Sequence, residues 1–265
     1  MLQQLALAFL ISLVISVVFY RRGSLSSSGV IGALLVGTSI FGFGGWAWGV
    51  LLGIFFVSSS LLSHFKEDEK KKVAADKFDK GHQRDLGQAL ANGGLGAAVA
   101  LLSYFFPSPL WFPLFIGIMG TVNADTWATE LGTLSKRPPR LITSLKQVEP
   151  GTSGGISPLG TAVSLLGGLI IGVAAGLLNP SLSFGLAILM GGIGGLSGSL
   201  FDSLLGATVQ AIYYSDHYQK ETEQKVDKAG HPTRHIRGWR WLNNDLVNAI
   251  ASLVGGLIAA VLGIW

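Results

Sequence analysis

The stretch "ISPLGTAVSLLGGLIIGVAAGLL", from Ile156 to Leu178, contains no charged residue. A helix that crosses the hydrocarbon core of a bilayer needs about 20 predominantly apolar residues, and this stretch is long enough. Gly168, Gly172 and Gly176 recur in it at four-residue spacing. Small residues at this spacing let the backbones of neighbouring membrane helices approach closely. The stretch therefore predicts a transmembrane helix packed tightly against another.

Apolar stretches of this kind recur along all 265 residues, of which 13% are charged and 49% hydrophobic. An ordinary soluble domain has about 25% charged residues. The chain has no Cys, which excludes disulfides, thiolate metal ligands and a Cys nucleophile. We therefore expect an all-α polytopic transmembrane bundle, a single domain over 1–265, with about eight spans (seven to nine). The expected spans are 3–20, 29–41, 46–62, 87–106, 110–122, 156–178, 184–212 and 243–263.

The basic residues divide the connections into two groups. All 19 Lys and Arg lie at 21–22 or in the loops 63–86, 123–155 and 213–242, and the alternate connections carry none. Eight spans of alternating direction place all the basic loops on one side of the membrane. The positive-inside rule makes that side cytoplasmic, or stromal in an organelle, with both termini on the other side.

Carboxylates enter the spans from this basic side. Asp125 lies in "NADTWATELG", Asp202 in "GSLFDSLLGATVQ" and Asp245 in "NNDLVN". Ionisable groups in membrane segments are costly, and their default interpretation is functional. Oxygen ligands of this kind suit Mg²⁺, and no His accompanies them, which disfavours zinc. The expected metal ligands are Asp125, Asp202, Asp245, Asn123, Asn248 and Glu130.

A glycine-rich turn and several cationic or amide side chains suggest phosphate binding on the same side. "PGTSGG", from Pro150 to Gly155, leads into a predicted helix, and consecutive backbone N–H groups there can hold a phosphate. Lys146 lies just upstream of the turn and is placed to neutralise the charge of this phosphate, whereas Arg84 is placed to neutralise an acceptor phosphate. The expected catalytic residues are Asp125, Asp202, Lys146 and Arg84. The expected phosphate-binding residues are Gly151, Thr152, Ser153, Gly154, Gly155, Gln88, Asn92 and Ser199.

Five ordered motifs together resemble one family. They are "QRDLGQALANGG", "NADTWATELG", "PRLITSLKQVEPGTSGGISPLG", "GSLFDSLLGATVQ" and "NNDLVN". The chain is similar over nearly its whole length to the phytyl-phosphate kinases of plants and cyanobacteria, a family that includes the transmembrane protein 19 group and archaeal relatives. Two positions depart from the family's pattern: Asp85 stands where Asn is expected, and the acid of "LNND" falls at Asp245.

The resemblance implies an enzyme that phosphorylates an isoprenyl monophosphate, such as phytyl phosphate, to the diphosphate. It implies a role in prenol salvage towards tocopherol and phylloquinone, with Mg²⁺ as cofactor and a nucleoside triphosphate, CTP, as donor. The expected partners are the membrane, the lipid prenyl phosphate and the nucleotide, but no nucleic acid, and a homodimer is compatible with the sequence.

Other functional classes remain open from the residues alone. Polar residues in Gly-rich membrane helices are also typical of a transporter or flippase of a small or lipid phosphate. The chain shows no convincing repeat of the carboxylates between its halves, which favours an enzyme with a site on one side. A CDP-alcohol-type transferase would carry a dense Asp motif along one helix, and this chain has none.

Overall fold

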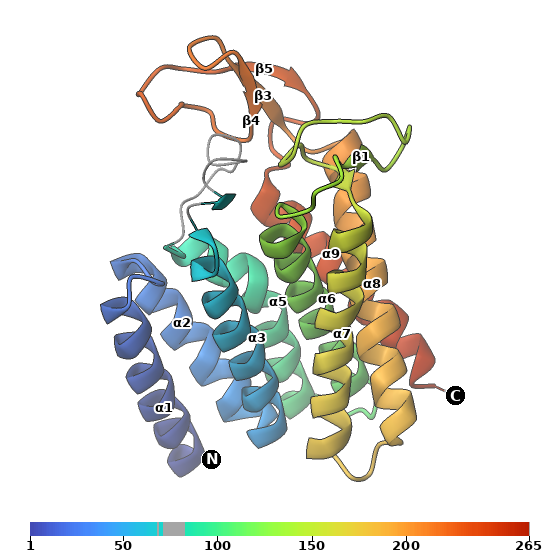
Figure 1. Cartoon of the computed structure of the whole chain (residues 1–265). Helices are drawn as coiled ribbons and strands as arrows, with labels where there is room; N and C mark the ends of the chain where they lie inside the picture. The colour runs from blue at the N-terminus through green and yellow to red at the C-terminus, as the bar shows by residue number, and fades with distance from the viewer. Residues whose placement is uncertain (68, 71–82, 265) are drawn as a thin grey trace.

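The computed structural model describes residues 1–67, 69–70 and 83–264. Within these residues, eight long helices lie side by side (Figure 1), and a short π-helix, η1 (Ile40–Gly44), extends the second of them. The helices are α1 (Leu2–Arg21), α2 (Ser27–Ser39), α3 (Trp46–His64), α5 (Leu86–Phe105), α6 (Trp111–Gly132), α7 (Pro158–Leu178), α8 (Phe184–Thr208) and α9 (Asn244–Leu262).

Seven of these helices, with α2 and η1 counted together, are long and apolar enough to cross a membrane. The predicted all-α polytopic bundle is confirmed, with helices close to the expected spans. The helix outside this group of seven is α6, which lies centrally in the bundle, and its residues 113–124 are all buried. The expected span 110–122 was too short, because α6 continues through Gly132 and carries the first part of the predicted loop 123–155.

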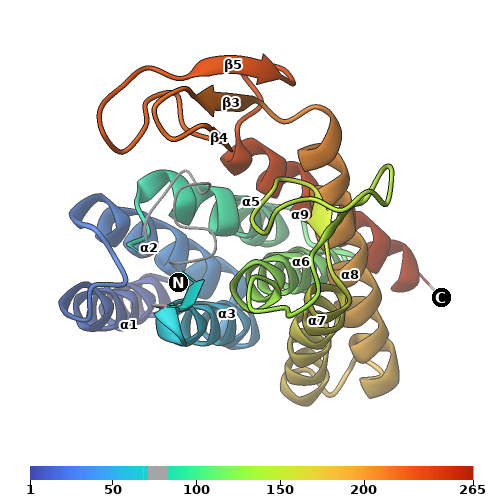
Figure 2. The same cartoon turned by 45° about the horizontal axis from the view of Figure 1, so that its top comes forward.

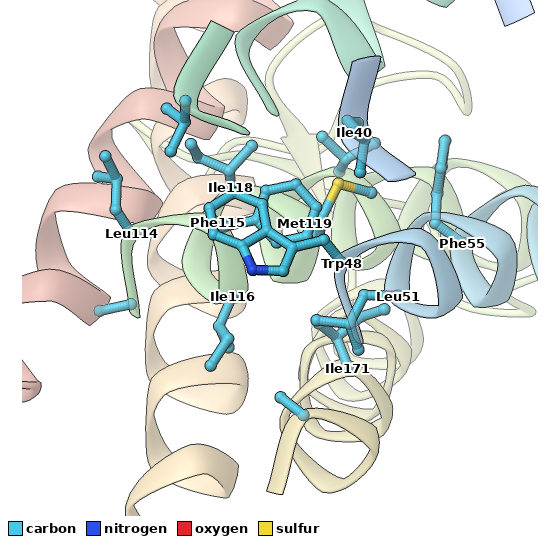
Figure 3. Packing of buried hydrophobic residues seen from close by; sticks show 14 of the residues in the cluster. Ile40, Trp48, Leu51, Phe55, Leu114, Phe115, Ile116, Ile118, Met119 and Ile171 are labelled. Atoms are coloured by element: carbon cyan, nitrogen blue, oxygen red, sulfur yellow. The ribbon is translucent and has the colours of Figure 1, made fainter. Parts of the chain in front are cut away.

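The apolar core forms where α6 meets α3 and α7. The rings of Phe115 on α6 and Trp48 on α3 stack with their centroids 4.3 Å apart. Ile118 and Met119 of α6 and Ile171 of α7 are fully buried beside them (Figure 3). Burying a large apolar side chain contributes about 1.5–3 kcal/mol. This packing fixes α6, which carries polar residues of the site at its far end.

Glycines bring α7 and α8 into backbone contact, as the spacing of small residues predicts. A Cβ added at Gly168 would lie 2.4 Å from the carbonyl oxygen of Gly191, and one at Gly191 would lie 2.4 Å from the backbone N of Gly172. Real Cβ atoms do not approach so closely, so only glycine fits at this crossing. The close approach sets the spacing of two helices that carry polar residues of the site, Ser164 on α7 and Asp202 on α8.

The long connections gather at one end of the bundle, as the distribution of basic residues predicts (Figure 1). They also contain short strands, which the sequence did not predict. In one connection, β1 (Arg140–Leu141) pairs with β2 (Gly155–Ile156). In the other, β3 (Ile212–Ser215) lies between β4 (Lys220–Thr222) and β5 (Arg234–Arg237). This three-stranded sheet lies beyond the ends of the helices, on the side of α5 and α9 (Figure 2).

Candidate functional site: a polar cavity at the loop end

A cavity of about 590 Å³ lies at the end of the bundle where the long connections gather. Residues of α3, α5, α6, α7, α8 and α9 line it, together with Lys70, Arg84, the 133–157 connection and two residues of the connection that precedes α9. Most of the predicted site residues meet here, although they are far apart in the sequence. These are Arg84, Gln88, Asn92, Asp125, Glu130, Gly151, Thr152, Ser153, Gly154, Gly155, Ser199, Asp202, Asp245 and Asn248.

Asp125 and Asp202 bring carboxylates into the wall from α6 and α8. The Oγ of Ser199, one turn before Asp202, donates a 3.4 Å hydrogen bond to Asp125 Oδ1 and so joins the two helices. Asp202 Oδ2 is buried and has no hydrogen-bond partner among the described residues. Buried polar atoms are normally satisfied, and an exception calls for an explanation such as a bound ion. Asp245 adds a carboxylate from the first turn of α9.

Asn123 does not reach the cavity. Its Nδ2 donates to the carbonyl oxygen of Gly167 at 2.8 Å, and its Oδ1 accepts from Ser58 Oγ at 3.0 Å. Trp127 Nε1 also donates to Ser58 Oγ, at 3.2 Å. These bonds use both ends of the amide to join α6 to α3 and α7. The expectation of a metal ligand is therefore replaced by a packing role for Asn123.

Glu130 lines the cavity but already has polar partners. Its Oε1 accepts a 2.6 Å hydrogen bond from Ser63 Oγ, and its Oε2 forms an ion pair with Lys70. The Lys70 side chain is 8% exposed, and its Nζ also donates to the carbonyl oxygens of Leu62 and Ser63. Lys70 thus ties the end of α3 to α6. In the sequence, Lys70 lies in a run of mixed charges, and this pattern does not indicate such a role.

Arg84 is held at the start of α5. Its backbone N donates to Ser24 O at 3.0 Å, and its guanidinium Nη1 donates to Ser60 Oγ at 3.1 Å. Burial lowers the pKa of Arg84 to about 10, an effect that the negative charge of Glu130 opposes, so the side chain stays cationic at neutral pH. The structure thus places a positive charge at the cavity wall where the sequence predicts one.

The next residues form the cap of α5. Asp85 Oδ1 accepts from the backbone N of Gln88 at 2.8 Å, and Gln88 Oε1 accepts from the backbone N of Asp85 at 3.2 Å. Such a capping box satisfies backbone donors at a helix start. It shows that Asp85 is the N-cap of α5 and that one end of the Gln88 amide is used by the helix.

The glycine-rich turn packs against the end of α8. Gly154 has φ +84°, and a Cβ there would lie 2.5 Å from the backbone N of Ala207. Ser153 Oγ donates to Gln210 Oε1 at 2.9 Å. Lys146, by contrast, lies exposed and does not line the cavity. The glycine-rich turn therefore lines the cavity as predicted, whereas Lys146, which was expected beside it, does not.

The connection that precedes α9 contributes residues that sequence reasoning missed. Glu223 and Lys228 line the cavity, as does Arg137 of the connection that follows α6. Arg237 Nη1 donates to Gly206 O at 2.8 Å, and its Nη2 donates to Ser153 O at 3.4 Å. The mixed charges of 213–242 indicate a solvated linker, so the sequence gave no sign that this segment folds against the site.

Replacing Gly154 by Ala is expected to destabilise the protein more than replacing Gly230 by Ala. Both glycines have positive φ, +84° and +86°, which costs an L-residue roughly 1–2 kcal/mol. Only at Gly154 does the new Cβ also meet backbone, so the cost should rise by a further ~1–3 kcal/mol. Thermal unfolding of the two variants in detergent measures the difference. Equal midpoints would show that the turn does not depend on its contact with α8.

Comparison with known proteins finds relatives that match nearly the whole chain. The family model described as "Integral membrane protein DUF92" matches residues 10–256. The chain is 33% identical to Protein PGR of Arabidopsis thaliana, with 99% of this chain and 97% of the relative covered. It is 32% identical to the uncharacterised membrane protein MJ0933 of Methanocaldococcus jannaschii, with 98% and 94% covered.

A further relative is Protein VTE6, chloroplastic, of Arabidopsis thaliana, which is 26% identical with 90% of this chain and 65% of the relative covered. No solved structure matches the chain. These relatives agree with the family resemblance carried by the five motifs. Because the family model spans most of the chain and two relatives exceed 30% identity over nearly its full length, the chain belongs to the DUF92 family of integral membrane proteins.

Proposed function

We propose that the protein is a membrane-embedded kinase that converts an isoprenyl monophosphate, such as phytyl phosphate, to the diphosphate, with CTP as donor and Mg²⁺ as cofactor. In this role it serves prenol salvage towards tocopherol and phylloquinone. The observation that carries the proposal is the cavity, in which carboxylates from α6, α8 and α9 face a glycine-rich turn and Arg84. The motif resemblance supports the substrate class.

The residues of the cavity fit Mg²⁺ bound jointly with a phosphate. Among the described residues, no three of the types His, Cys, Asp and Glu lie close enough to hold a metal on their own. Mg²⁺ does not require such a group, because it commonly takes one or two carboxylates and completes its shell with water and substrate phosphate. Asp125 and the unpartnered oxygen of Asp202 supply such carboxylates, and Asp245 and Asn248 lie in the same wall.

The chemistry requires positioning more than covalent participation by the protein. An acceptor phosphate oxygen forms a bond to the γ-phosphorus of the donor, and the bond from that phosphorus to the β,γ-bridging oxygen breaks. The products are the prenyl diphosphate and the nucleoside diphosphate. The acceptor oxygen is already anionic near neutral pH, so no strong general base is needed. Bound Mg²⁺ would supply charge neutralisation on the donor phosphates.

The protein's own groups hold the two reactants. Arg84 contributes a fixed cation at the start of α5, where a lipid phosphate at the membrane surface can reach it. The backbone of Gly151 to Gly155 lies in the cavity wall at the end of α8, where its N–H groups can donate hydrogen bonds to phosphate oxygens. We place this end of the bundle on the cytoplasmic or stromal side, where the nucleotide is available.

The purified protein with Mg²⁺ is expected to convert labelled phytyl phosphate to the diphosphate. CTP, ATP, GTP and UTP are supplied in turn, with CTP expected to support the fastest reaction. The product is identified by chromatography against authentic phytyl diphosphate. A folded, monodisperse preparation that produces no diphosphate from any prenyl phosphate would overturn the kinase proposal, and uptake of a phosphate compound by proteoliposomes would then favour the transporter.

A further inference from the structure

Lys228 is the lysine that the three-stranded sheet brings to the cavity. The cavity wall among the described residues contains five carboxylates: Asp125, Glu130, Asp202, Glu223 and Asp245. Its cations are Lys70, Arg84, Arg137 and Lys228. Lys70 lies near the end of α3, where it pairs with Glu130, and Arg84 lies at the start of α5. Arg137 and Lys228 come from the long connections that follow α6 and precede α9, so a polyanionic ligand near the sheet would meet these two cations.

A hydrogen-bonded turn fixes the backbone at Lys228. The buried carboxylate of the preceding residue, Asp227, accepts from Ser215 Oγ at 2.8 Å, from Ala229 N at 3.0 Å and from His231 N at 2.9 Å. Desolvation raises the pKa of Asp227, but the hydrogen bonds, together with the positive charge of His231, outweigh it and hold the pKa below its ordinary value. The turn around Lys228 thus has a defined anchor on β3.

The sheet that carries this turn is joined to the glycine-rich turn. Gln210 is buried, and its Oε1 accepts from Ser153 Oγ at 2.9 Å while its Nε2 donates to Glu223 Oε1 at 2.8 Å. Arg237 on β5 bonds the carbonyl oxygens of both Ser153 and Gly206. These contacts join the loop 133–157 to the end of α8 and to the sheet. Lys228 therefore has a defined position relative to the glycine-rich turn.

We propose that Lys228 binds the phosphates of the nucleotide donor, in the role that the sequence suggested for Lys146. The inference rests on the proposed function. The sheet lies beyond the helix ends (Figure 1), so with the helices across the membrane as proposed it is farther from the bilayer than the start of α5. A soluble nucleotide reaches the cavity from that side, whereas the phosphate of a lipid acceptor stays near the membrane surface and Arg84. A lysine ammonium acts on phosphate as a mobile point charge with three donors, which suits an exposed position at the rim.

The test measures binding and kinetics in Lys228→Met, with Lys225→Met as the matched control. Lys225 belongs to the same connection and is exposed, but it does not line the cavity. Binding of Mg²⁺ and inorganic tripolyphosphate to the purified proteins is measured by calorimetry, and KM is measured separately for CTP and for phytyl phosphate. Lys228→Met should weaken tripolyphosphate binding and raise the KM for CTP at least tenfold, with the KM for phytyl phosphate unchanged.

Lys228→Arg keeps the charge and should recover most of the affinity, whereas Lys225→Met and Lys146→Met should behave as wild type. Tripolyphosphate binding unchanged in Lys228→Met would overturn this inference, and a wild type that still produces diphosphate would leave the kinase proposal standing. Conversely, Lys228-dependent binding in a protein that transfers no phosphoryl group would refute the kinase and retain the phosphate site. Size-exclusion chromatography in detergent confirms that each variant is folded.

Discussion

Replacing Asp202 by Asn is expected to lower prenyl-phosphate kinase turnover by roughly 100-fold or more, the range seen when one preorganised electrostatic group is removed from an active site. The proposed metal would lose a carboxylate and its charge. Folding should be unaffected, because Asp202 Oδ2 has no hydrogen-bond partner to lose among the described residues. Turnover with CTP and phytyl phosphate and the thermal unfolding midpoint in detergent measure the two effects on one preparation.

The combination of these two results separates a functional carboxylate from a structural one. A structural Asp would lose stability on conversion to Asn, because a hydrogen bond of the charged group is worth about 1.5–3 kcal/mol. Asp216→Asn is the matched control, since Asp216 is exposed on the same side of the molecule and lies 3.9 Å from Arg234. Wild-type turnover in Asp202→Asn would remove this residue from the site, and loss of folding would assign it a structural role.

The helical architecture could be predicted because it depends on apolar length. Each expected span overlaps one helix, and the positions of Lys and Arg predict which connections share an end. The C-terminal end of α6 was not predicted, because the length of an apolar stretch does not mark where a helix ends when that helix is buried inside the bundle. Asp125 and Glu130 lie in its last turns and face a polar cavity rather than lipid, so their charges do not mark the end of the helix.

The membrane-side part of the site could also be predicted, since carboxylates in apolar segments are conspicuous. The contribution of the connections could not be predicted, because their charges follow no periodic pattern. Lys146 and Lys228 look alike in the sequence, and only the pairing of β3 with β4 and β5 and the turn at Asp227 bring one of them to the cavity. Asn123 likewise resembles a ligand until its contacts with Ser58 and Gly167 are known.

The second large effect is expected at the crossing of α7 and α8, where replacing Gly191 by Leu should prevent stable folding. A Cβ at Gly191 would lie 2.4 Å from Gly172 N and 2.5 Å from Gly168 O. Both atoms belong to backbone that cannot rotate away, so the helices must separate. Overpacking of a core costs about 1–3 kcal/mol where side chains can yield, and more is expected where only backbone is in contact.

Gly185→Leu provides the matched control, because Gly185 lies on the same helix and a Cβ there meets nothing within 4 Å. Both variants add the same apolar side chain to α8, and leucine is about 1 kcal/mol better than glycine for helix formation, so hydrophobicity and helix propensity cannot explain a difference between them. We expect Gly185→Leu to elute from detergent size-exclusion chromatography as wild type, and Gly191→Leu to aggregate or unfold at a much lower temperature.

If both variants fold and catalyse equally, the glycine contact does not set the helix spacing. A folded but inactive Gly191→Leu would instead show that this spacing controls how Asp202 on α8 meets Ser164 on α7 and Asp125 on α6 across the cavity.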